Sequence, residues 1–296
     1  MTVDTKYKSG KSEGDENFPV ASRIVAARHR APILAFYRFA RAADDAADHP
    51  TLDPQSKLSI LSALEETLLG HSDSATDALA LREQLQLRGL SAQHALDLLT
   101  AFRQDVTKLR YDTWEELLEY CRYSAMPVGR FVLDVHGESK ATWAASDALC
   151  TALQIINHLQ DCAKDYRNID RVYIPANDLS AHGIGVEALA EPEASPALRA
   201  CLHALAARTE TLMPDAALLP ASVVDLRLAV ETSVIVELAR KLIILLKTRD
   251  PLSDRVHLSK FQAATYAARA TAATLASRAL ARFAFSKTTG MMPHER

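Results

Sequence analysis

The feature that most restricts the fold of this chain is a line of polar residues within the apolar segment 154–165. Gln154, Asn157, Asp161 and Asp165 lie three or four residues apart. At about 100° per residue, all four fall on one face of an α-helix. The other faces carry mainly Leu and Ile. Because buried carboxylates and amides are costly without partners, this pattern predicts a packed helix whose polar face meets a ligand.

A second acidic stripe occurs near residue 45. Asp44 and Asp48 lie four residues apart, so they share a helix face on which like charges repel. Asp45 adds a third acid, and the preceding residues, including Phe39, look buried. From this segment alone, a cluster that binds a cation and an exposed acidic turn before Pro50 are equally good interpretations. Two such stripes in one chain favour a shared cation.

Composition narrows the fold class further. Only 9 Gly and 12 Pro occur in 296 residues, which is too few for the turns of an all-β protein, and Ala and Leu dominate. The net charge of −3 argues against a nucleic-acid-binding protein. Residues 1–16 are polar and lack a secretory signal, and the most apolar stretch, 233–246, is interrupted by charges. We therefore expect an all-α, single-domain protein with no membrane span.

Helical spacing and breakers divide the chain into elements. Pro32 is expected to break the first helix, whereas Pro127 and Gly129 are expected to kink a long one. Thr113 and Glu116 form a capping-box pattern, and 167–186 is expected to be a loop. Residues 1–15 and 287–296 are predicted tails that flank a domain at 16–286. The expected helices are 20–47, 53–69, 77–88, 91–109, 113–136, 139–166, 197–212, 220–248 and 259–285.

The chemistry of the stripes points to a hard metal ion. Their donors are oxygens, which suit Mg²⁺, Mn²⁺ or Ca²⁺, and Mg²⁺ is commonly held by carboxylates together with substrate phosphates. Two facing stripes therefore predict a magnesium–diphosphate clamp. The sequence contains no Glu-x-x-His and no P-loop, and its four cysteines lack metal-site spacing and are expected to be reduced. His158 points off the stripe and is interpreted as a packing residue or as a residue that supports the ligands from behind.

Taken together, these motifs resemble the squalene/phytoene synthase family over roughly residues 18–179. The resemblance implies a class I terpenoid synthase fold, with helices around a central cavity. Two departures stand out: Gln160 replaces an Arg common before the first Asp of the second motif, and Lys164 stands where an acid is common. The matching segments are Asp44–Asp48, Gln154–Asp165, Phe36–Arg41, Tyr120–Cys121, Val128–Gly129 and Arg171–Pro175.

The resemblance also implies roles for individual residues. Arg41 and Arg171 are the nearest basic candidates for diphosphate, with structural salt bridges to the acids as the alternative. The predicted ligands of two or three Mg²⁺ are Asp44, Asp48, Asn157, Asp161 and Asp165. The predicted catalytic residues are Tyr120, Tyr37, Asp105 and Asp45, and the other substrate-binding residues are Tyr173, Phe18, Gln154, Val128 and Gly129.

Three strings are similar to a bacterial branch of the family that serves hopanoid biosynthesis: 16–22, 123–130 and 249–252. That branch acts on presqualene diphosphate, and water captures the rearranged cation without NADPH. Head-to-head coupling of two farnesyl diphosphates would use the same metal site. A non-catalytic helical assembly factor is a further alternative, but it would be expected to lose the aspartates. No nucleic-acid partner is expected.

The resemblance also implies a setting in the cell. We expect a cytoplasmic protein that is peripheral at the inner face of the membrane and makes transient contact with that surface. Its isoprenoid diphosphate substrate is expected to be handed over by a presqualene diphosphate synthase.

Overall fold

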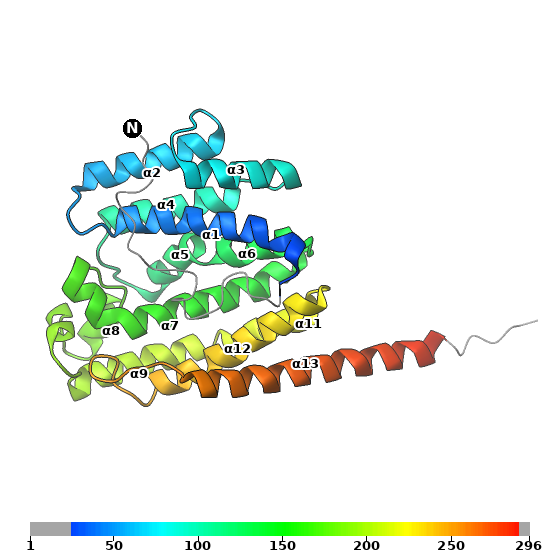
Figure 1. Ribbon diagram of the computed structural model, residues 1–296. Helices are drawn as coiled ribbons and strands as arrows, with labels where there is room; N and C mark the ends of the chain where they lie inside the picture. The colour runs from blue at the N-terminus through cyan, green and yellow to red at the C-terminus, as the bar shows by residue number, and fades with distance from the viewer. Residues whose placement is uncertain (1–24, 290–296) are drawn as a thin grey trace, which may run out of the picture.

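The computed structural model describes residues 25–289, and within that range its regular elements are all helices (Figure 1). Short 3-10 turns occur at Lys140–Thr142 and Val186–Ala190. The α-helices are α1 (Ala27–Ala47), α2 (Pro54–Leu69), α3 (Thr76–Arg88), α4 (Gln93–Thr107), α5 (Trp114–Ser124), α6 (Met126–His136), α7 (Trp143–Ile169), α8 (Ala176–Ala181), α9 (Pro196–Glu210), α10 (Met213–Ala216), α11 (Leu219–Ser222), α12 (Leu226–Leu246) and α13 (Lys260–Thr289).

The helices are stacked in layers, with α7 in the middle of the molecule (Figure 1). On one side, α1 packs against α2, α3 and α4 around a core that includes Phe36, Phe39 and Leu99. On the other side, α7 packs against α9, α10 and α12 around a larger core. α13 lies along α12, and its C-terminal end extends past the other helices (Figure 1). Among the described residues, no helix is both long enough and apolar enough to cross a bilayer.

Several helix ends follow directly from the sequence. The Asp53 carboxylate accepts a hydrogen bond from the Ser56 amide at 3.0 Å and caps α2, which ends at Gly70 with a φ of 87°. Thr113 caps α5 by accepting from the Glu116 amide at 3.2 Å. The reciprocal bond differs from the expected capping box, because the Glu116 carboxylate accepts from the amide of Asp112. The predicted start of α5 is therefore confirmed, with this change in its capping.

The prediction that Pro32 breaks the first helix is wrong, because Pro32 lies buried inside α1. A proline leaves the carbonyl four residues earlier without its helical donor, and here that carbonyl belongs to Arg28. The guanidinium of Arg88, at the end of α3, donates to this same carbonyl oxygen. A tertiary contact thus replaces the lost bond and lets the helix continue.

Two further expectations also need correction. The expected kinked helix 113–136 is two helices, α5 and α6, which meet at Ala125 (φ −125°, ψ −48°). Pro127 stands in the first turn of α6, where the missing N–H costs nothing, so a new helix begins there. The expected loop 167–186 contains the end of α7 and the short helix α8. The predicted tail 1–15 lies outside the described residues, and α13 continues to Thr289, into the predicted tail 287–296.

Gly129 lets α6 and α7 approach each other closely. A Cβ atom at this position would lie 2.3 Å from Ser146 Oγ and 2.6 Å from Cys150 Sγ, both on α7. Such distances are well inside van der Waals contact. The small residue therefore serves tight helix packing.

We expect Gly129→Ala to lower the free energy of unfolding by about 1–3 kcal/mol, because overpacking outweighs the better helix propensity of Ala. Chemical denaturation would measure the loss. In a Ser146→Ala, Cys150→Ala background, which removes both clashing atoms, the same substitution should cost much less. An equal cost in both backgrounds would contradict a contact between Gly129 and α7.

Candidate active site

The two acidic stripes face each other across the ends of α1 and α7. Burial, then the charges of Asp161 and Asp48, raise the pKa of Asp165 to about 7. Burial and the charge of Asp48 likewise raise the pKa of Asp44 to about 7, although its side chain is 35% exposed. Asp48 on α1 thus acts on carboxylates of both helices. The structure therefore brings acids of both stripes close enough to influence one another's pKa.

Arg41 is held by two acids of its own helix. Its Nη1 lies 2.5 Å from Asp44 Oδ2, and its Nη2 lies 2.5 Å from Asp45 Oδ1. These spacings of three and four residues are those at which helical side chains meet. In this structure Arg41 therefore forms the salt bridges that the sequence allowed as the alternative to diphosphate binding.

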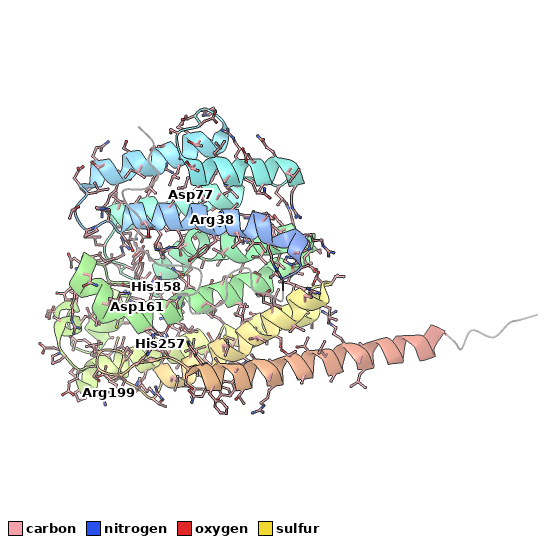
Figure 2. All side chains as sticks on the ribbon, viewed as in Figure 1. Arg38, Asp77, His158, Asp161, Arg199 and His257 are labelled. Atoms are coloured by element: carbon pink, nitrogen blue, oxygen red, sulfur yellow. The ribbon has the colours of Figure 1, made fainter. Side chains whose placement is uncertain are left out.

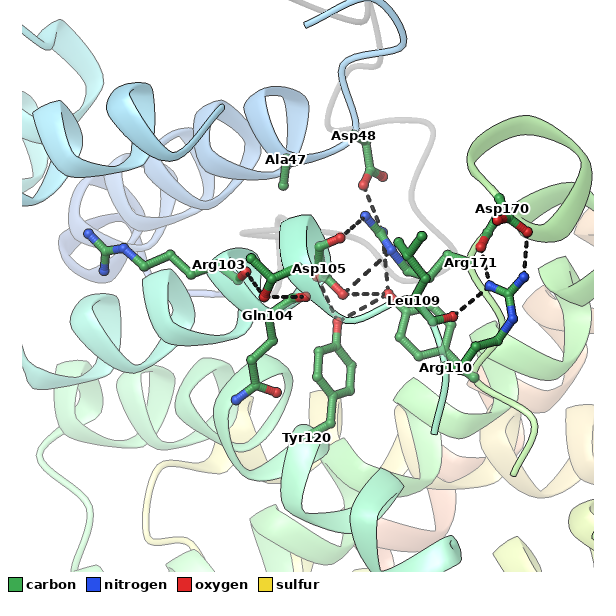
Figure 3. A network of polar contacts seen from close by, with 12 residues as sticks. Ala47, Asp48, Arg103, Gln104, Asp105, Leu109, Arg110, Tyr120, Asp170 and Arg171 are labelled. Carbon is green, nitrogen blue, oxygen red and sulfur yellow. Dashed lines mark hydrogen bonds and ion pairs between the residues drawn. The ribbon is translucent and has the colours of Figure 1, made fainter. Parts of the chain in front are cut away.

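Arg171 joins α1 to the end of α4 (Figure 3). Its guanidinium, 6% exposed, donates from Nη1 to Asp48 Oδ1 at 2.8 Å and from Nη2 to the Asp105 carbonyl at 2.9 Å. Its Nε also lies 3.7 Å from Asp105 Oδ1. One buried cation is therefore shared by acids that are far apart in the sequence.

The backbone after α7 positions Arg171. Val172 donates its amide to the Leu109 carbonyl at 3.0 Å, within an isolated parallel bridge between Arg110 and Val172. The side chain of Arg110 also pairs with Asp170 (Figure 3). The segment that follows α7 is thus fixed to the segment that follows α4, which sets Arg171 beside Asp105.

Two tyrosines complete the network around Asp105. Tyr120 donates its hydroxyl to Asp105 Oδ2 at 2.9 Å, and Tyr173 donates to Asp105 Oδ1 at 2.8 Å. Burial raises the pKa of Asp105 to about 6, while Arg171 and the two hydroxyls oppose that rise. Each phenol has one hydroxyl proton, and here it donates that proton in a hydrogen bond to Asp105. Both phenol oxygens can therefore only accept further hydrogen bonds.

His158 stacks flat on the ring of Tyr173, with ring centroids 3.5 Å apart, and lies on α7 near Asp161 (Figure 2). Burial, and to a lesser extent Arg171, lowers its pKa to about 3, so the ring is neutral at neutral pH. His158 therefore packs against a residue of the Asp105 network, through its contact with Tyr173.

The remaining predicted ligands lie on α7. Asp161 meets Lys164 at 3.8 Å, a contact between half-exposed side chains that contributes little. Asn157 and Gln154 precede Asp161 at one-turn intervals on the same face, and both are partly buried. This face carries oxygen donors, which suit a hard divalent cation, and the charge of Asp48 reaches it at Asp165.

Three other predicted residues lie on α1 and α6. Val128 is 41% exposed at the start of α6, and Gly129 packs on α7. Tyr37 is partly buried on α1. Phe18 lies outside the described residues, so its predicted role stays a prediction.

Sequence reasoning missed Lys57. Its Nζ donates to the Ala47 carbonyl at 2.9 Å, at the end of α1. Burial lowers the pKa of Lys57, while the charge of Asp48 opposes this change. Lys57 comes from α2, so no spacing rule within one helix could have associated it with the aspartates.

Gln160, the departure noted in the second motif, anchors a loop. Its amide donates to the Val256 carbonyl and lies 3.2 Å from His257 Nδ1. The same loop is organised by the buried Asp250, which accepts from the amides of Ala194 at 2.7 Å and Leu252 at 2.9 Å. Gln160 therefore ties α7 to the segment before α13.

The chain matches the model of the squalene/phytoene synthase family over residues 11–262. It is 56% identical to a hydroxysqualene synthase of Rhodopseudomonas palustris, covering 88% of this chain and 90% of that protein. It is 53% identical to a hydroxysqualene synthase of Sinorhizobium fredii, covering 98% and 99%.

A solved structure is also similar to this one. The crystal structure of squalene synthase HpnC from Alicyclobacillus acidocaldarius superposes with a TM-score of 0.69 at 32% identity, covering 77% of this chain and 86% of that one. The facing aspartates, the helical fold and these similarities agree with one another. The chain belongs to the squalene/phytoene synthase family.

Proposed function

We propose that this chain releases diphosphate from presqualene diphosphate and adds water to the resulting cation, which gives hydroxysqualene. The observation that carries this proposal is the similarity, over nearly the full length of both chains, to two proteins named hydroxysqualene synthase. Head-to-head coupling of farnesyl diphosphate remains the second candidate, because the aspartates would serve it equally well.

The donor set supports a role for Mg²⁺. The acids of α1 and α7 offer only oxygen atoms, and burial, together with repulsion from neighbouring acids, raises the pKa of Asp44 and Asp165 to about 7 each. Divalent cations between the helices would relieve this repulsion. When bound, Mg²⁺ supplies Lewis-acid neutralisation of the departing diphosphate. The proposed ligands are Asp44, Asp48, Asn157, Asp161 and Asp165.

Arg171 and Arg41 are proposed to position the aspartates and to share the charge of the diphosphate. Arg171 holds Asp48 at 2.8 Å, which fixes one carboxylate of the clamp. Guanidinium groups also match phosphate oxygens geometrically, so an arriving diphosphate can compete for their outer N–H groups. This role combines the two alternatives that the sequence left open for these residues.

In the proposed reaction, the carbon–oxygen bond breaks and diphosphate leaves with the electron pair. The carbocation rearranges, the oxygen of water adds to it, and the adduct loses one proton. The rings of Tyr120 and Tyr173 can stabilise the cation. Their oxygens accept from water because both protons are committed to Asp105. Asp105, with a pKa of about 6, is the base that we assign to the released proton.

The proposal extends to the cellular setting. A product as apolar as a C30 alcohol must leave into lipid, so we propose transient contact with a membrane at its cytoplasmic face. Substrate transfer from a presqualene diphosphate synthase would keep a reactive intermediate out of water.

Activity should depend strictly on a divalent cation. EDTA should abolish turnover and Mg²⁺ should restore it. Asp161→Asn should lower kcat by at least about a hundredfold, since the charge that develops on the leaving group then loses part of its stabilisation. Its melting temperature without metal should not fall, because a repulsive charge has been removed. The matched control is Asp215→Asn, at an exposed aspartate of α10.

A collapse of the Asp161→Asn melting temperature with ordinary residual activity would show that Asp161 is structural. Full activity in metal-free buffer would rule out the clamp.

The product should be an alcohol whose oxygen comes from solvent. With presqualene diphosphate, Mg²⁺ and H₂¹⁸O, mass spectrometry should find ¹⁸O in hydroxysqualene, and added NADPH should not divert the product to squalene. Squalene as the main product with NADPH would assign the chain to squalene synthases. Efficient consumption of farnesyl diphosphate alone would assign it to the coupling enzymes.

A further inference from the structure

A second cluster of ligating side chains lies away from the aspartates. One ligand atom each of His29, His136 and Asp225 lies within 4.8 Å of those of the other two. The three residues stand at the start of α1, the end of α6 and the N-cap of α12. His29 precedes Asp44 by fifteen residues on α1, which is roughly 22 Å at the rise of a helix. The cluster is therefore separate from the candidate active site.

The hydrogen bonds of the two histidines fix which ring nitrogen carries the lone pair. His136 Nδ1 lies 2.8 Å from the Val132 carbonyl, so it carries the proton and Nε2 carries the lone pair. This is the arrangement by which metal-binding histidines are commonly oriented. His29 Nε2 accepts from Arg28 Nε at 2.8 Å, so its lone pair is held by Arg28 and becomes available when that side chain moves away. Nδ1 of His29 is buried with no hydrogen-bond partner.

The carboxylate of Asp225 has one oxygen bound to the backbone and one left for another partner. Oδ1 accepts hydrogen bonds from the amides of Arg227 at 2.8 Å and Leu228 at 3.0 Å at the start of α12. Oδ2 is the atom that Arg28 Nη2 approaches, at 3.7 Å.

A cation already lies against this cluster. Arg28, whose side chain is 71% exposed, touches His29 through Nε and reaches within 3.7 Å of Asp225 Oδ2 through Nη2. The neighbouring backbone is also fixed, because the Glu138 carboxylate accepts from the amides of Val224 and Asp225 at 2.8–2.9 Å. The cluster therefore surrounds the positive charge of Arg28, and this exposed side chain would move away when a metal ion binds.

We propose that His29, His136 and Asp225 form a second metal site, selective for a borderline divalent cation such as Zn²⁺. Two imidazoles and one carboxylate are a ligand set of zinc sites, whereas the oxygen-only acids of α1 and α7 suit Mg²⁺. An ion here would tie the start of α1 and the start of α12 to the end of α6. It would therefore stabilise the fold without taking part in the reaction.

The test is a titration of the EDTA-treated full chain with Zn²⁺ by calorimetry, in excess Mg²⁺, with Co²⁺ as a visible probe. We expect one equivalent bound. His136→Gln should weaken binding at least about tenfold and abolish the Co²⁺ band. Arg28→Ala should tighten binding several-fold, because a competing cation is removed. Asp161→Asn and His71→Gln, at an exposed histidine, should bind like the parent.

Three results would overturn the proposal. These are parent-like binding by His136→Gln, loss of the zinc equivalent in Asp161→Asn, or no tightening in Arg28→Ala. Circular dichroism would check that His136→Gln is folded. If His136→Gln is not folded, the zinc affinity of Arg28→Ala alone decides the test. The exposed side chain of Arg28 can be removed without disturbing the core.

Discussion

The geometry of the candidate site depends on the buried guanidinium of Arg171. The guanidinium binds Asp48, at the end of α1, and the carbonyl of Asp105 on α4. Arg171 itself lies just after the end of α7. Loss of one partner of a buried ion pair typically costs about 3–5 kcal/mol, because the other charge is left unpaired. Together with the backbone bridge between Arg110 and Val172, this side chain therefore connects three helices that are distant in sequence. Both acidic stripes lie on helices that these contacts connect.

The same cation separates two chemical environments. On one side, burial and then the charges of Asp161 and Asp48 raise the pKa of Asp165 to about 7. On the other side, Arg171 opposes the rise in the pKa of Asp105 and so favours the ionised carboxylate, which accepts hydrogen bonds from Tyr120 and Tyr173. One region suits a multivalent anion bound through metal ions, and the other suits a carbocation that meets water. The proposed reaction needs both regions close together, and Arg171 connects them.

Much of the fold was predictable because it follows from local rules. The polar line from Gln154 to Asp165 required a helix, and caps such as Asp53 and Gly70 fixed where α2 begins and ends. The prediction that α1 breaks at Pro32 failed because the compensating donor, Arg88, comes from another helix. The separation of α5 from α6 was missed because a proline within an apolar run can kink a helix as well as start one.

In the candidate site too, some features follow from local spacing and others depend on contacts between helices. Spacing within one helix identified both acidic stripes, but it could not show that Lys57 reaches the end of α1. Nor could spacing within one helix decide whether Gly129 served a cavity or a helix crossing, since that depends on Ser146 and Cys150 of α7. The His29, His136 and Asp225 cluster spans almost two hundred residues, so only the folded chain brings it together.

We propose that the acids of α1 and α7 form one clamp for metal and diphosphate. Crystals grown with Mn²⁺ and inorganic diphosphate would test it by anomalous scattering. We expect manganese peaks between Asp44, Asp48, Asp161 and Asp165, with diphosphate oxygens completing the coordination. A well-ordered diphosphate elsewhere, with no anomalous density between the two helices, would contradict the account.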